Sequence, residues 1–274
     1  MKHIIVTGGL GNQMFIFAFY YAFLKSGEKV RLDTSLYNVI RMHNGYELPF
    51  VFGISKDNIH KGKFHTFILR LILKSKFYLQ IDQNKFISDV FKTSKKYYWG
   101  YWQTDKYFND YRNEIVNIFS FKHISQYNMS IAETMKKIES VSLHIRRGDY
   151  LLHDQYANIC TEVYYNSAIK LIKEKIENPI FYIFSNDIQW SKAFANRHNI
   201  NYIIIAHNSG KDSYQDMFLM SQCKHNILAN SSFSWWGAYL NQYSNAIKIA
   251  PKKWDNTDSQ EYNKLRVPSS YIRI

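Results

Sequence analysis

The sequence predicts an α/β protein with open, mostly parallel sheets, and three observations support this class. Within the first 33 residues an apolar strand, a glycine turn, an aromatic helix and a second strand follow one another. The same alternation returns after residue 130 and continues to about residue 241. The chain has 274 residues, 46% of them hydrophobic, which is enough for one large or two modest cores. Ligands of such sheets bind at the carboxyl ends of the strands, so the loops there are examined for function.

The predicted elements fall into two units. In the first we predict a strand at 3–7, a helix at 13–25 and a strand at 29–33, whereas residues 38–98 show no regular pattern. We place the domain boundary so that residues 1–125 form one domain and residues 126–274 the other, and the C-terminal tail could pack back on the first. The second unit is expected to contain helix 131–137, strand 141–145, helix 162–176, strand 180–184, helix 190–197, strand 202–205, helix 214–222, strand 226–229 and helix 233–241.

Charge and cysteine content narrow the class of protein. The formal charge of +13 indicates an anionic partner, which is a nucleic acid, an acidic membrane surface or a phosphorylated small molecule. The usual nucleic-acid-binding modules do not occur, so we expect no nucleic-acid partner. Two cysteines, Cys160 and Cys223, and no signal-peptide pattern are typical of a reducing compartment, so we expect a cytoplasmic protein. The nearest approach to a membrane-spanning helix, Gln13 to Leu24, is shorter than the roughly 18 to 20 residues that such a helix needs.

The first polar loop has the sequence TGGLGNQMF and separates a strand from a helix. Glycine lets a ligand approach the backbone closely, and the helix that follows offers amide N–H groups to an anion. Asn12 and Gln13 are suited to bonding a sugar or a phosphate. The alternative for Asn12 is a cap of the helix.

A dinucleotide-binding motif is the rival interpretation of this loop. Gly9 and Gly11 begin G-x-G-x-x-G, and Asp33 ends the next strand, as a nicotinamide-dependent oxidoreductase would require. Met14 stands where the third glycine belongs, which weakens that motif.

The second polar loop, HIRRGDY, follows the predicted strand 141–145. Side chains alternate along a strand, so His144 and Arg146 project from one face and Arg147 from the other. A guanidinium at the position of Arg146 presents a fork that fits diphosphate oxygens. Arg147 shares its face with apolar residues and needs a partner, for which Asp149 is the nearest carboxylate. The alternative is that both arginines form structural salt bridges.

The third polar loop, NSSFSWWGAYL, joins a buried strand to an aromatic helix. Ser231, Ser232 and the local amides form a second candidate cradle for phosphate. The alternative is that one serine only caps the helix. For Trp235 and Trp236 we expect a place in the core.

Taken together, and in this order, the stretches GGLGNQMF, HIRRGDY, FSND and NSSFSWWGAYL resemble the bacterial α-1,2-fucosyltransferases, relatives of the α-1,6- and protein O-fucosyltransferases. GYWQTDKYF and NICTEVYYNSAI are similar to two further stretches of that family, so the resemblance spans residues 8–240. It implies a GT-B architecture, with two Rossmann-like domains around a central cleft. Residues 1–125 would be the acceptor side and residues 126–274 the GDP-fucose-binding domain.

The resemblance also implies roles for single residues. The arginine that grips the nucleotide diphosphate corresponds to Arg146, and the histidine near the nucleotide corresponds to His144. The asparagine that reaches the sugar-phosphate across the cleft corresponds to Asn12, and the phosphate-binding serines correspond to Ser231 and Ser232.

The guanine-contacting acidic residue corresponds to Asp187, although Asn186 departs from the family's FSDD pattern. The predicted catalytic residues are Arg146, Asn12 and Asp149, and the predicted substrate-binding residues are Gly11, Gln13, His144, Asn186, Asp187, Ser231, Ser232 and Phe233.

The implied reaction moves L-fucose from GDP-β-L-fucose to the 2-hydroxyl of a terminal galactoside with inversion; a fucosyltransferase of the α-1,6 type is the alternative. We expect no metal and no cofactor, because Arg146 and backbone amides would stabilise the leaving phosphate and no D-x-D occurs. For the general base we consider Asp149 first, with Glu47 and Asp105 in reserve. A structural pairing of Asp149 with Arg147 is the alternative.

The acceptor is expected to be a galactose-containing oligosaccharide or a lipid-linked glycan. Trp99, Tyr101 and Trp102 could stack on sugar rings, or belong to the core. The basic, apolar segment 61–78 has the pattern of a helix at a membrane surface, or of a solvated amphipathic helix. Peripheral contact with the inner face of a membrane is therefore a further expectation.

Overall fold

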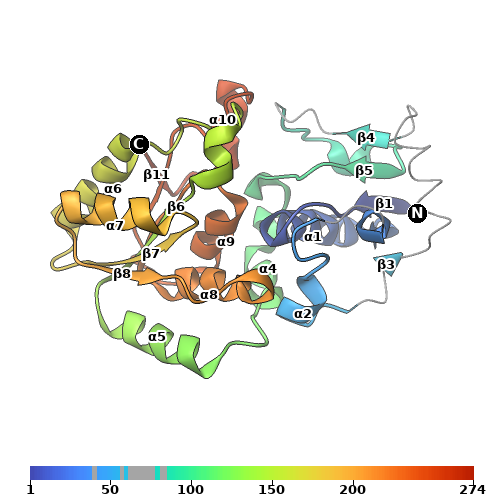
Figure 1. The fold of residues 1–274 in the computed structure, drawn as a ribbon. Coiled ribbons are helices and arrows are strands. Elements are labelled where there is room, and N and C mark those ends of the chain that lie inside the picture. Colours follow the sequence, from blue (N-terminus) through green and yellow to red (C-terminus); the bar gives the residue numbers. More distant parts are fainter. Residues whose placement is uncertain (39–41, 56–58, 61–77, 81–84) are drawn as a thin grey trace. The chain divides into compact units, whose positions relative to one another are not determined.

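The computed structural model of the chain describes residues 1–38, 42–55, 59–60, 78–80 and 85–274 (Figure 1). The chain divides into two compact units, Met1–His123 and Ile124–Ile274. The segment 61–77, on which the membrane-surface prediction mainly depends, lies outside the described residues.

The N-terminal unit is built on a five-stranded parallel sheet with the strand order β3-β2-β1-β5-β4. Its strands are β1 (Lys2–Ile5), β2 (Val30–Asp33), β3 (Ile59–His60), β4 (Tyr78–Gln80) and β5 (Tyr97–Trp99). Its helices are α1 (Leu10–Lys25), α2 (Leu48–Phe52) and α4 (Arg112–Ile118), with 3-10 turns η1 (Ser35–Asn38), η2 (Val90–Lys92), η3 (Asp105–Tyr107) and η4 (Asn109–Tyr111).

The helix α1 is buried on most sides because its sequence is apolar all round. Its aromatic residues join those of β5 and the following loop in one core, in which the rings of Phe19 and Trp102 stack with centroids 3.9 Å apart. The turn before the helix depends on glycine. Gly8 has φ = +79°, and a Cβ there would lie 2.7 Å from Nδ2 of Asn12.

The C-terminal unit contains a six-stranded parallel sheet with the order β11-β10-β9-β6-β7-β8. Its strands are β6 (Ser140–Ile145), β7 (Ile180–Ser185), β8 (Tyr202–Ile205), β9 (His225–Ile227), β10 (Lys248–Ala250) and β11 (Ile272–Arg273). Its helices are α5 (Gln126–Lys137), α6 (Glu162–Lys175), α7 (Ile188–Arg197), α8 (Tyr214–Gln222), α9 (Ser232–Leu240) and α10 (Gln260–Arg266), with 3-10 turns η5 (Gly148–Leu152) and η6 (Gly210–Asp212).

The central strand β6 is buried along its whole length, and its two faces differ. Val141, Leu143 and Ile145 pack with apolar residues of α6 and α7 in one core cluster. The opposite face carries polar residues. Ser142 accepts a hydrogen bond from Asn226 on β9, whose Nδ2 also donates to a carbonyl oxygen of α8. This alternation is the one that the sequence predicts for 141–145.

The prediction of an α/β protein with two parallel-sheet units is confirmed. The predicted strand 202–205 and helix 214–222 coincide with β8 and α8, and the helix predicted at 13–25 begins earlier, at Leu10. Three elements near the C-terminus, β10, α10 and β11, were not predicted, since two of them are strands of three and two residues with little periodicity to read. The end of the chain, for which packing against the first domain was considered, forms β11 of this sheet.

Candidate active site

The strand order of the C-terminal sheet reverses beside β6. The chain runs outward from β6 to β7 and β8, then crosses to the other side of β6 with β9. Loops that leave two neighbouring strands in opposite directions open a crevice at their carboxyl ends, where doubly wound proteins bind ligands. The residues that we predict for the nucleotide lie in the loops after β6, β7 and β9, except His144, which lies near the end of β6 itself.

Arg146 is the first charged residue after β6, and one third of its side chain is exposed. Its Nη2 lies 2.8 Å from Oδ2 of Asp149, and its guanidinium carbon lies 5.1 Å from the centre of the Tyr150 ring. The Nε atom is buried and has no hydrogen-bond partner among the described residues. The arginine is therefore held at the edge of the sheet, with part of its fork bonded to a carboxylate of the same loop.

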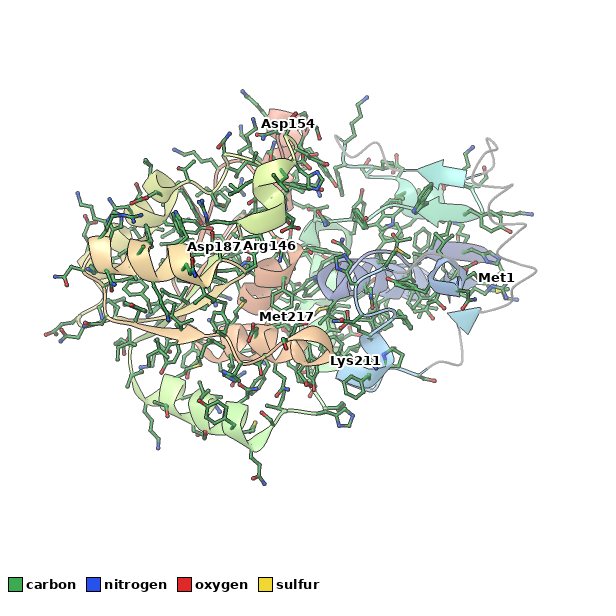
Figure 2. The ribbon with its side chains drawn as sticks, viewed as in Figure 1. Met1, Arg146, Asp154, Asp187, Lys211 and Met217 are labelled. Carbon is green, nitrogen blue, oxygen red and sulfur yellow. The ribbon has the colours of Figure 1, made fainter. Side chains whose placement is uncertain are left out.

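Arg147 points the other way, as strand alternation predicts, but its expected partner was wrong. Its Nε lies 3.2 Å from Oδ2 of Asp187, and its guanidinium carbon lies 4.2 Å from the centre of the Trp190 ring. Figure 2 labels Asp187 and Arg146 in this unit. The reason is the turn at Gly148, which has φ = +42° and carries the chain back over the side of Arg146. Proximity in sequence therefore selected the wrong carboxylate for Arg147, since Asp149 pairs with Arg146 instead.

Asn186 and Asp187 follow β7 and contact the loop after β6. Asn186 Oδ1 accepts a hydrogen bond from the amide of Arg147 at 2.9 Å, and its Nδ2 donates to Oδ1 of Asp149 at 3.3 Å. Asp187 caps α7 by accepting from the amide of Trp190 at 3.1 Å, besides its pairing with Arg147. A contact with guanine stays a prediction for Asp187, whose carboxylate already has these two partners.

His144 lies on β6 on the same face as Arg146 and is buried. Burial, helped by the nearby positive charge of Arg146, lowers the pKa of the imidazole to about 3. Its Nδ1 has no hydrogen-bond partner within the described parts of the chain, and its ring lies 6.2 Å from that of Phe233. At neutral pH this residue is an uncharged imidazole with one vacant hydrogen-bonding nitrogen, placed beside the arginine.

Ser231, Ser232 and Phe233 lie where β9 leads into α9. The hydroxyl of Ser231 accepts from the amide of Phe233 at 3.3 Å and caps the helix, as the structural alternative predicted. It also bonds to the hydroxyl of Tyr150, which lies in the loop after β6. Ser232 and Phe233 are half-buried in the first turn, where backbone N–H groups have no partner within the helix. Trp236 is fully buried, and so is its neighbour Trp235, as expected.

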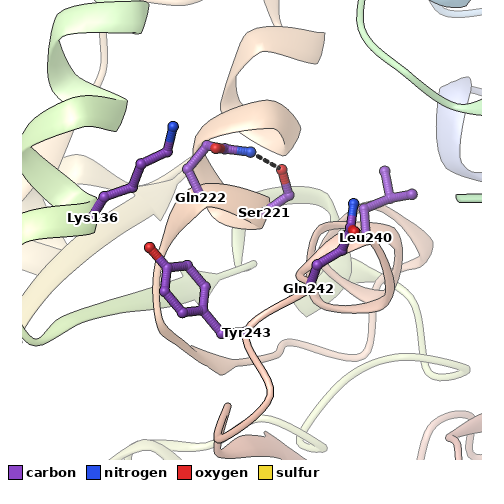
Figure 3. Close-up of a pocket in the computed structure, with 6 residues that line it drawn as sticks. All are labelled: Lys136, Ser221, Gln222, Leu240, Gln242 and Tyr243. Atoms are coloured by element: carbon purple, nitrogen blue, oxygen red, sulfur yellow. Dashed lines mark hydrogen bonds between the residues drawn. The ribbon is translucent and has the colours of Figure 1, made fainter. Parts of the chain in front are cut away.

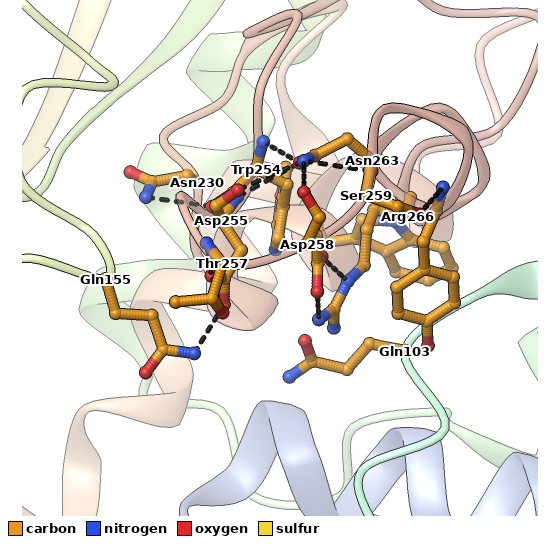
Figure 4. A network of polar contacts seen from close by, with 12 residues as sticks. Gln103, Gln155, Asn230, Trp254, Asp255, Thr257, Asp258, Ser259, Asn263 and Arg266 are labelled. Carbon is orange, nitrogen blue, oxygen red and sulfur yellow. Dashed lines mark hydrogen bonds and ion pairs between the residues drawn. The ribbon is translucent and has the colours of Figure 1, made fainter. Parts of the chain in front are cut away.

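A buried polar network connects the β9–α9 loop to the segment that contains Trp254 (Figure 4). Nδ2 of Asn230, the residue before Ser231, donates to the carbonyl of Trp254 at 3.2 Å. Asn263 holds the segment that contains Trp254, because its Oδ1 accepts hydrogen bonds from the amides of Trp254 and Asp255 at 2.5 and 3.1 Å. Sequence reasoning missed this support, because its residues come from a part of the chain with no motif.

In the N-terminal sheet the strand order reverses between β1 and β5, and the loops there are uncharged. Asn12 is half-buried, and its Oδ1 accepts a hydrogen bond from Nε2 of Gln103 at 2.6 Å. The helix α1 begins at Leu10 with Gly9 at the cap position and no side-chain cap. Asn12 is therefore not a helix cap, and the contact with Gln103 places it at the edge where β1 and β5 end.

The side chain of Gln13 is fully buried and bonded within the protein, so its contact with a substrate stays a prediction. Its Nε2 donates to the carbonyls of Gly8 and Gly45 at 3.1 and 2.8 Å, and its Oε1 accepts from the amide of Glu47 at 2.9 Å. It joins the loop after β1 to the segment before α2. Gly11 is buried in the first turn of α1.

The dinucleotide interpretation needs a carboxylate at the end of β2 that reaches a ribose. Asp33 is fully buried instead, and its Oδ1 accepts from the amide of Ser35 at 2.9 Å. The carboxylate thus begins the turn η1. The structure gives the oxidoreductase alternative no ribose-binding residue at this position.

The aromatic residues considered for acceptor binding, and Glu47, considered as a general base, differ in their burial and contacts. Trp102 is 1% exposed in the core, so it cannot stack on a sugar. Tyr101 is half-buried, and its hydroxyl bonds to Thr7; Trp99 packs against Ile5 and Leu36. Glu47 is buried, and burial raises the pKa of its carboxyl group, which accepts a hydrogen bond from Asn44.

A polar pocket of about 280 Å³ lies elsewhere in the C-terminal unit (Figure 3). Helices of a parallel α/β unit end at the amino edge of the sheet, so this pocket lies at the edge opposite to Arg146. We therefore locate the candidate site from its side chains rather than from this cavity. The pocket is lined by Lys136, Ser221, Gln222, Leu240, Gln242 and Tyr243, which lie at or after the ends of α5, α8 and α9.

The described parts of the chain contain no group of three or more His, Cys, Asp or Glu side chains arranged to hold a metal ion. Among the helices in those parts, none is long and apolar enough to cross a membrane.

Comparison with known proteins gives a consistent result over nearly the whole chain. An E. coli alpha-1,2-colitosyltransferase is 34% identical over 98% of this chain and 97% of its own length. The E. coli O-antigen biosynthesis glycosyltransferase WbnK is 29% identical over 91% and 93%. A galactoside alpha-(1,2)-fucosyltransferase 1 of Leontocebus fuscicollis is 23% identical over 49% of this chain and 40% of its own.

Solved structures are less similar. The fucosyltransferase NodZ from Bradyrhizobium is 11% identical with a TM-score of 0.47, over 86% of this chain and 90% of its own. The E. coli ADP-heptose lps heptosyltransferase II is 12% identical with a TM-score of 0.44, over 100% and 90%. The family assignment comes from sequence instead, since the model of glycosyl transferase family 11 matches residues 1–268. The chain belongs to glycosyl transferase family 11, and its relatives include α-1,2-colitosyl- and α-1,2-fucosyltransferases.

Proposed function

We propose that this protein is an inverting, metal-independent glycosyltransferase that moves L-fucose from GDP-β-L-fucose to the 2-hydroxyl of a terminal galactoside. The single observation that carries the proposal is the position of Arg146. It lies at the reversal of strand order in the C-terminal sheet, beside a neutral buried His144 and the loop that begins α9. This combination favours a nucleotide diphosphate, because a guanidinium and helix N-terminal amides both bind phosphate oxygens.

The identity of the donor sugar is the part of the proposal with a close rival. Colitose is L-fucose without its 3-hydroxyl, and a relative with 34% identity is named for that sugar. The proposal of fucose rests on the resemblance of the stretches around Asn12 and Arg146 to the α-1,2-fucosyltransferases. GDP-colitose is the second candidate donor, and an α-1,6-type linkage is the second candidate product.

The reaction forms a bond between the acceptor oxygen and C1 of the sugar and breaks the bond from C1 to the β-phosphate oxygen. Negative charge grows on the departing GDP, and Arg146 with the amides of the first turn of α9 stabilises it. Positive charges already present in the protein perform this task, so no metal ion takes part in the proposed step. The proton of the acceptor hydroxyl passes to a general base.

The general base must lie on the side of the sugar away from the diphosphate, because inversion requires attack opposite to the leaving group. Asp149 is bonded to Arg146, the proposed diphosphate ligand, which puts its carboxylate on the leaving-group side. Glu47 of the N-terminal unit is the reserve candidate. Burial raises the pKa of its carboxyl group, which favours proton acceptance, and Gln13 holds its backbone near the loop of Asn12.

The test is a transfer assay with GDP-fucose and GDP-colitose and a panel of galactosides that includes a lipid-linked glycan. We expect an α-1,2-linked product from GDP-fucose, read by NMR, at a rate unchanged by saturating EDTA. Faster turnover of GDP-colitose would change the donor and keep the mechanism. Activity that is lost on chelation and restored by Mg²⁺ or Mn²⁺ would overturn the metal-independent step, and turnover of neither donor would overturn the proposed function.

A further inference from the structure

The contact between Arg146 and Asp149 is supported by the loops after β6 and β7. Oδ2 of Asp149 lies 2.8 Å from Nη2 of Arg146. Its other oxygen accepts a hydrogen bond from Asn186, whose Oδ1 is itself fixed by the amide of Arg147. The carboxylate is therefore held from two sides, one of them by the loop after β7.

Gly148 shows that the local backbone is adapted to this contact. It has φ = +42°, and a Cβ at this position would lie 2.6 Å from Nδ2 of Asn186. Only glycine adopts this backbone conformation easily and leaves room for the amide that holds Asp149. The pairing is thus not a chance arrangement of two flexible surface side chains.

The pair is also weak enough to open. One third of the Arg146 side chain and half of the Asp149 side chain are exposed, and solvent-exposed pairs of this kind contribute little to stability. A diphosphate carries more charge than one carboxylate and binds an arginine through two parallel hydrogen bonds, so it displaces Asp149. The displaced carboxylate then lies close to the anion that took its place, and the two charges repel each other.

From this geometry we infer that Asp149 is a built-in competing anion, which yields Arg146 to the incoming nucleotide and returns to it when GDP leaves. The inference rests on the proposed function of Arg146 as the diphosphate ligand. In the transfer reaction the donor brings two phosphates that GDP retains, so a site with an unopposed arginine would hold its product too long. Asp149 lowers the affinity for GDP and speeds product release.

The experiment compares the wild type with Asp149→Asn, which keeps the shape of the side chain and removes its charge. Calorimetry gives the Kd of GDP, inorganic pyrophosphate and guanosine, and stopped flow gives the dissociation rate of a fluorescent GDP. We expect Asp149→Asn to bind GDP about two- to tenfold more tightly, chiefly through slower dissociation. Pyrophosphate should change in the same direction, whereas guanosine, which has no phosphate, should bind equally well to both proteins.

Two controls keep the result specific. Glu162→Gln removes a carboxylate with similar exposure, paired to Arg197 at 2.9 Å in the same unit, and should leave the Kd of GDP unchanged. Asp149→Asn added to Arg146→Ala should give no gain over Arg146→Ala, because the competition needs the arginine. Asp149→Ser replaces Asp149→Asn if the latter does not fold.

Unchanged or weaker binding of GDP by a folded Asp149→Asn would overturn the inference and make Asp149 a residue that positions Arg146 for the ligand. Equal tightening for guanosine would also overturn it, since no phosphate is then involved. Failure of the wild type to bind GDP at all is a different outcome. It would refute the proposed function itself, before Asp149 is considered.

Discussion

Both sheets of this protein reverse their strand order beside their first strand, β1 or β6, but they place different chemistry at the reversal. The loops after β6 and β7 carry two arginines, each paired with a carboxylate: Arg146 with Asp149, and Arg147 with Asp187. Between β1 and β5 the corresponding loops meet through an amide pair, Asn12 with Gln103, and a glycine turn. The folding rule that produces the crevice is common to both, so the fold alone does not assign a ligand.

The difference indicates a division of labour. Charged side chains in the loops of the C-terminal sheet (the C-terminal edge) suit the diphosphate of a nucleotide. A diphosphate needs bidentate hydrogen bonds and positive charge. Neutral amides in the loops of the N-terminal sheet (the N-terminal edge) suit a sugar, because sugar hydroxyls both donate and accept hydrogen bonds. Four experiments test this difference between the two sheets.

The largest effect is expected at Arg146. Arg146→Lys should lower kcat roughly 10²- to 10³-fold, because an ammonium group cannot provide the planar fork that stabilises the leaving diphosphate. Arg197→Lys, at an exposed arginine paired with Glu162, is the control and should keep wild-type turnover. Steady-state kinetics with GDP-fucose give both values, and near-normal turnover of Arg146→Lys would remove the diphosphate from the C-terminal edge.

At the N-terminal edge, Asn12→Ala should lower kcat and kcat/KM by similar factors of about 10 to 100, the value of a hydrogen bond to a charged group. The KM for the donor and the Kd of GDP should stay nearly unchanged, because in the proposed function the nucleotide binds at the C-terminal sheet. Asn109→Ala, at an exposed asparagine of η4, is the matched control. Preserved turnover in Asn12→Ala would show that the neutral edge takes no part in catalysis.

Arg147 tests whether the two neighbouring arginines differ in role. Arg147→Ala should destabilise the C-terminal domain by roughly 1 kcal/mol, since it loses the pair with Asp187 and the contact with the Trp190 ring. A fall in Tm of about 2 to 4 °C is expected for a domain of this size. Arg197→Ala removes an ion pair without a ring contact and should shift Tm less. An unchanged Tm with lost activity would show that Arg147, and not Arg146, binds the diphosphate.

The smallest effect concerns the protonation of His144. Its folded pKa of about 3 lies below the ordinary value, so the folded state resists protonation and its stability falls as the pH drops from 6.5 towards 3. An NMR titration of labelled histidines should therefore show one imidazole that stays neutral down to pH 5, and His144→Gln identifies its signal. Titration of that signal near pH 6.5 would contradict the buried, neutral assignment.

Much of the fold follows from local patterns. Hydrophobic runs located β6, β7 and β8, and the order of strands and helices predicted parallel sheets. The alternation of side chains along a strand also separated Arg146 from Arg147 correctly, because it depends only on a residue's immediate neighbours. Short elements without periodicity, such as β10 and β11, could not be found in this way. The roles in substrate binding that were inferred from family resemblance stay predictions.

The sequence by itself determined which face each residue occupies, since that depends on the backbone geometry of a few adjacent residues. The ion-pair and hydrogen-bond partners of these side chains, in contrast, depend on the tertiary structure. Arg147 meets Asp187 because β6 and β7 are neighbours in the sheet, and Asp149 returns to Arg146 because Gly148 turns the chain back. Gln13 was predicted to contact a substrate, and in the structure its buried side chain bonds to the segment before α2. The physical reason is the same in each case: a polar side chain bonds to the groups that strand order brings within about 3 Å, and strand order is a property of the whole chain.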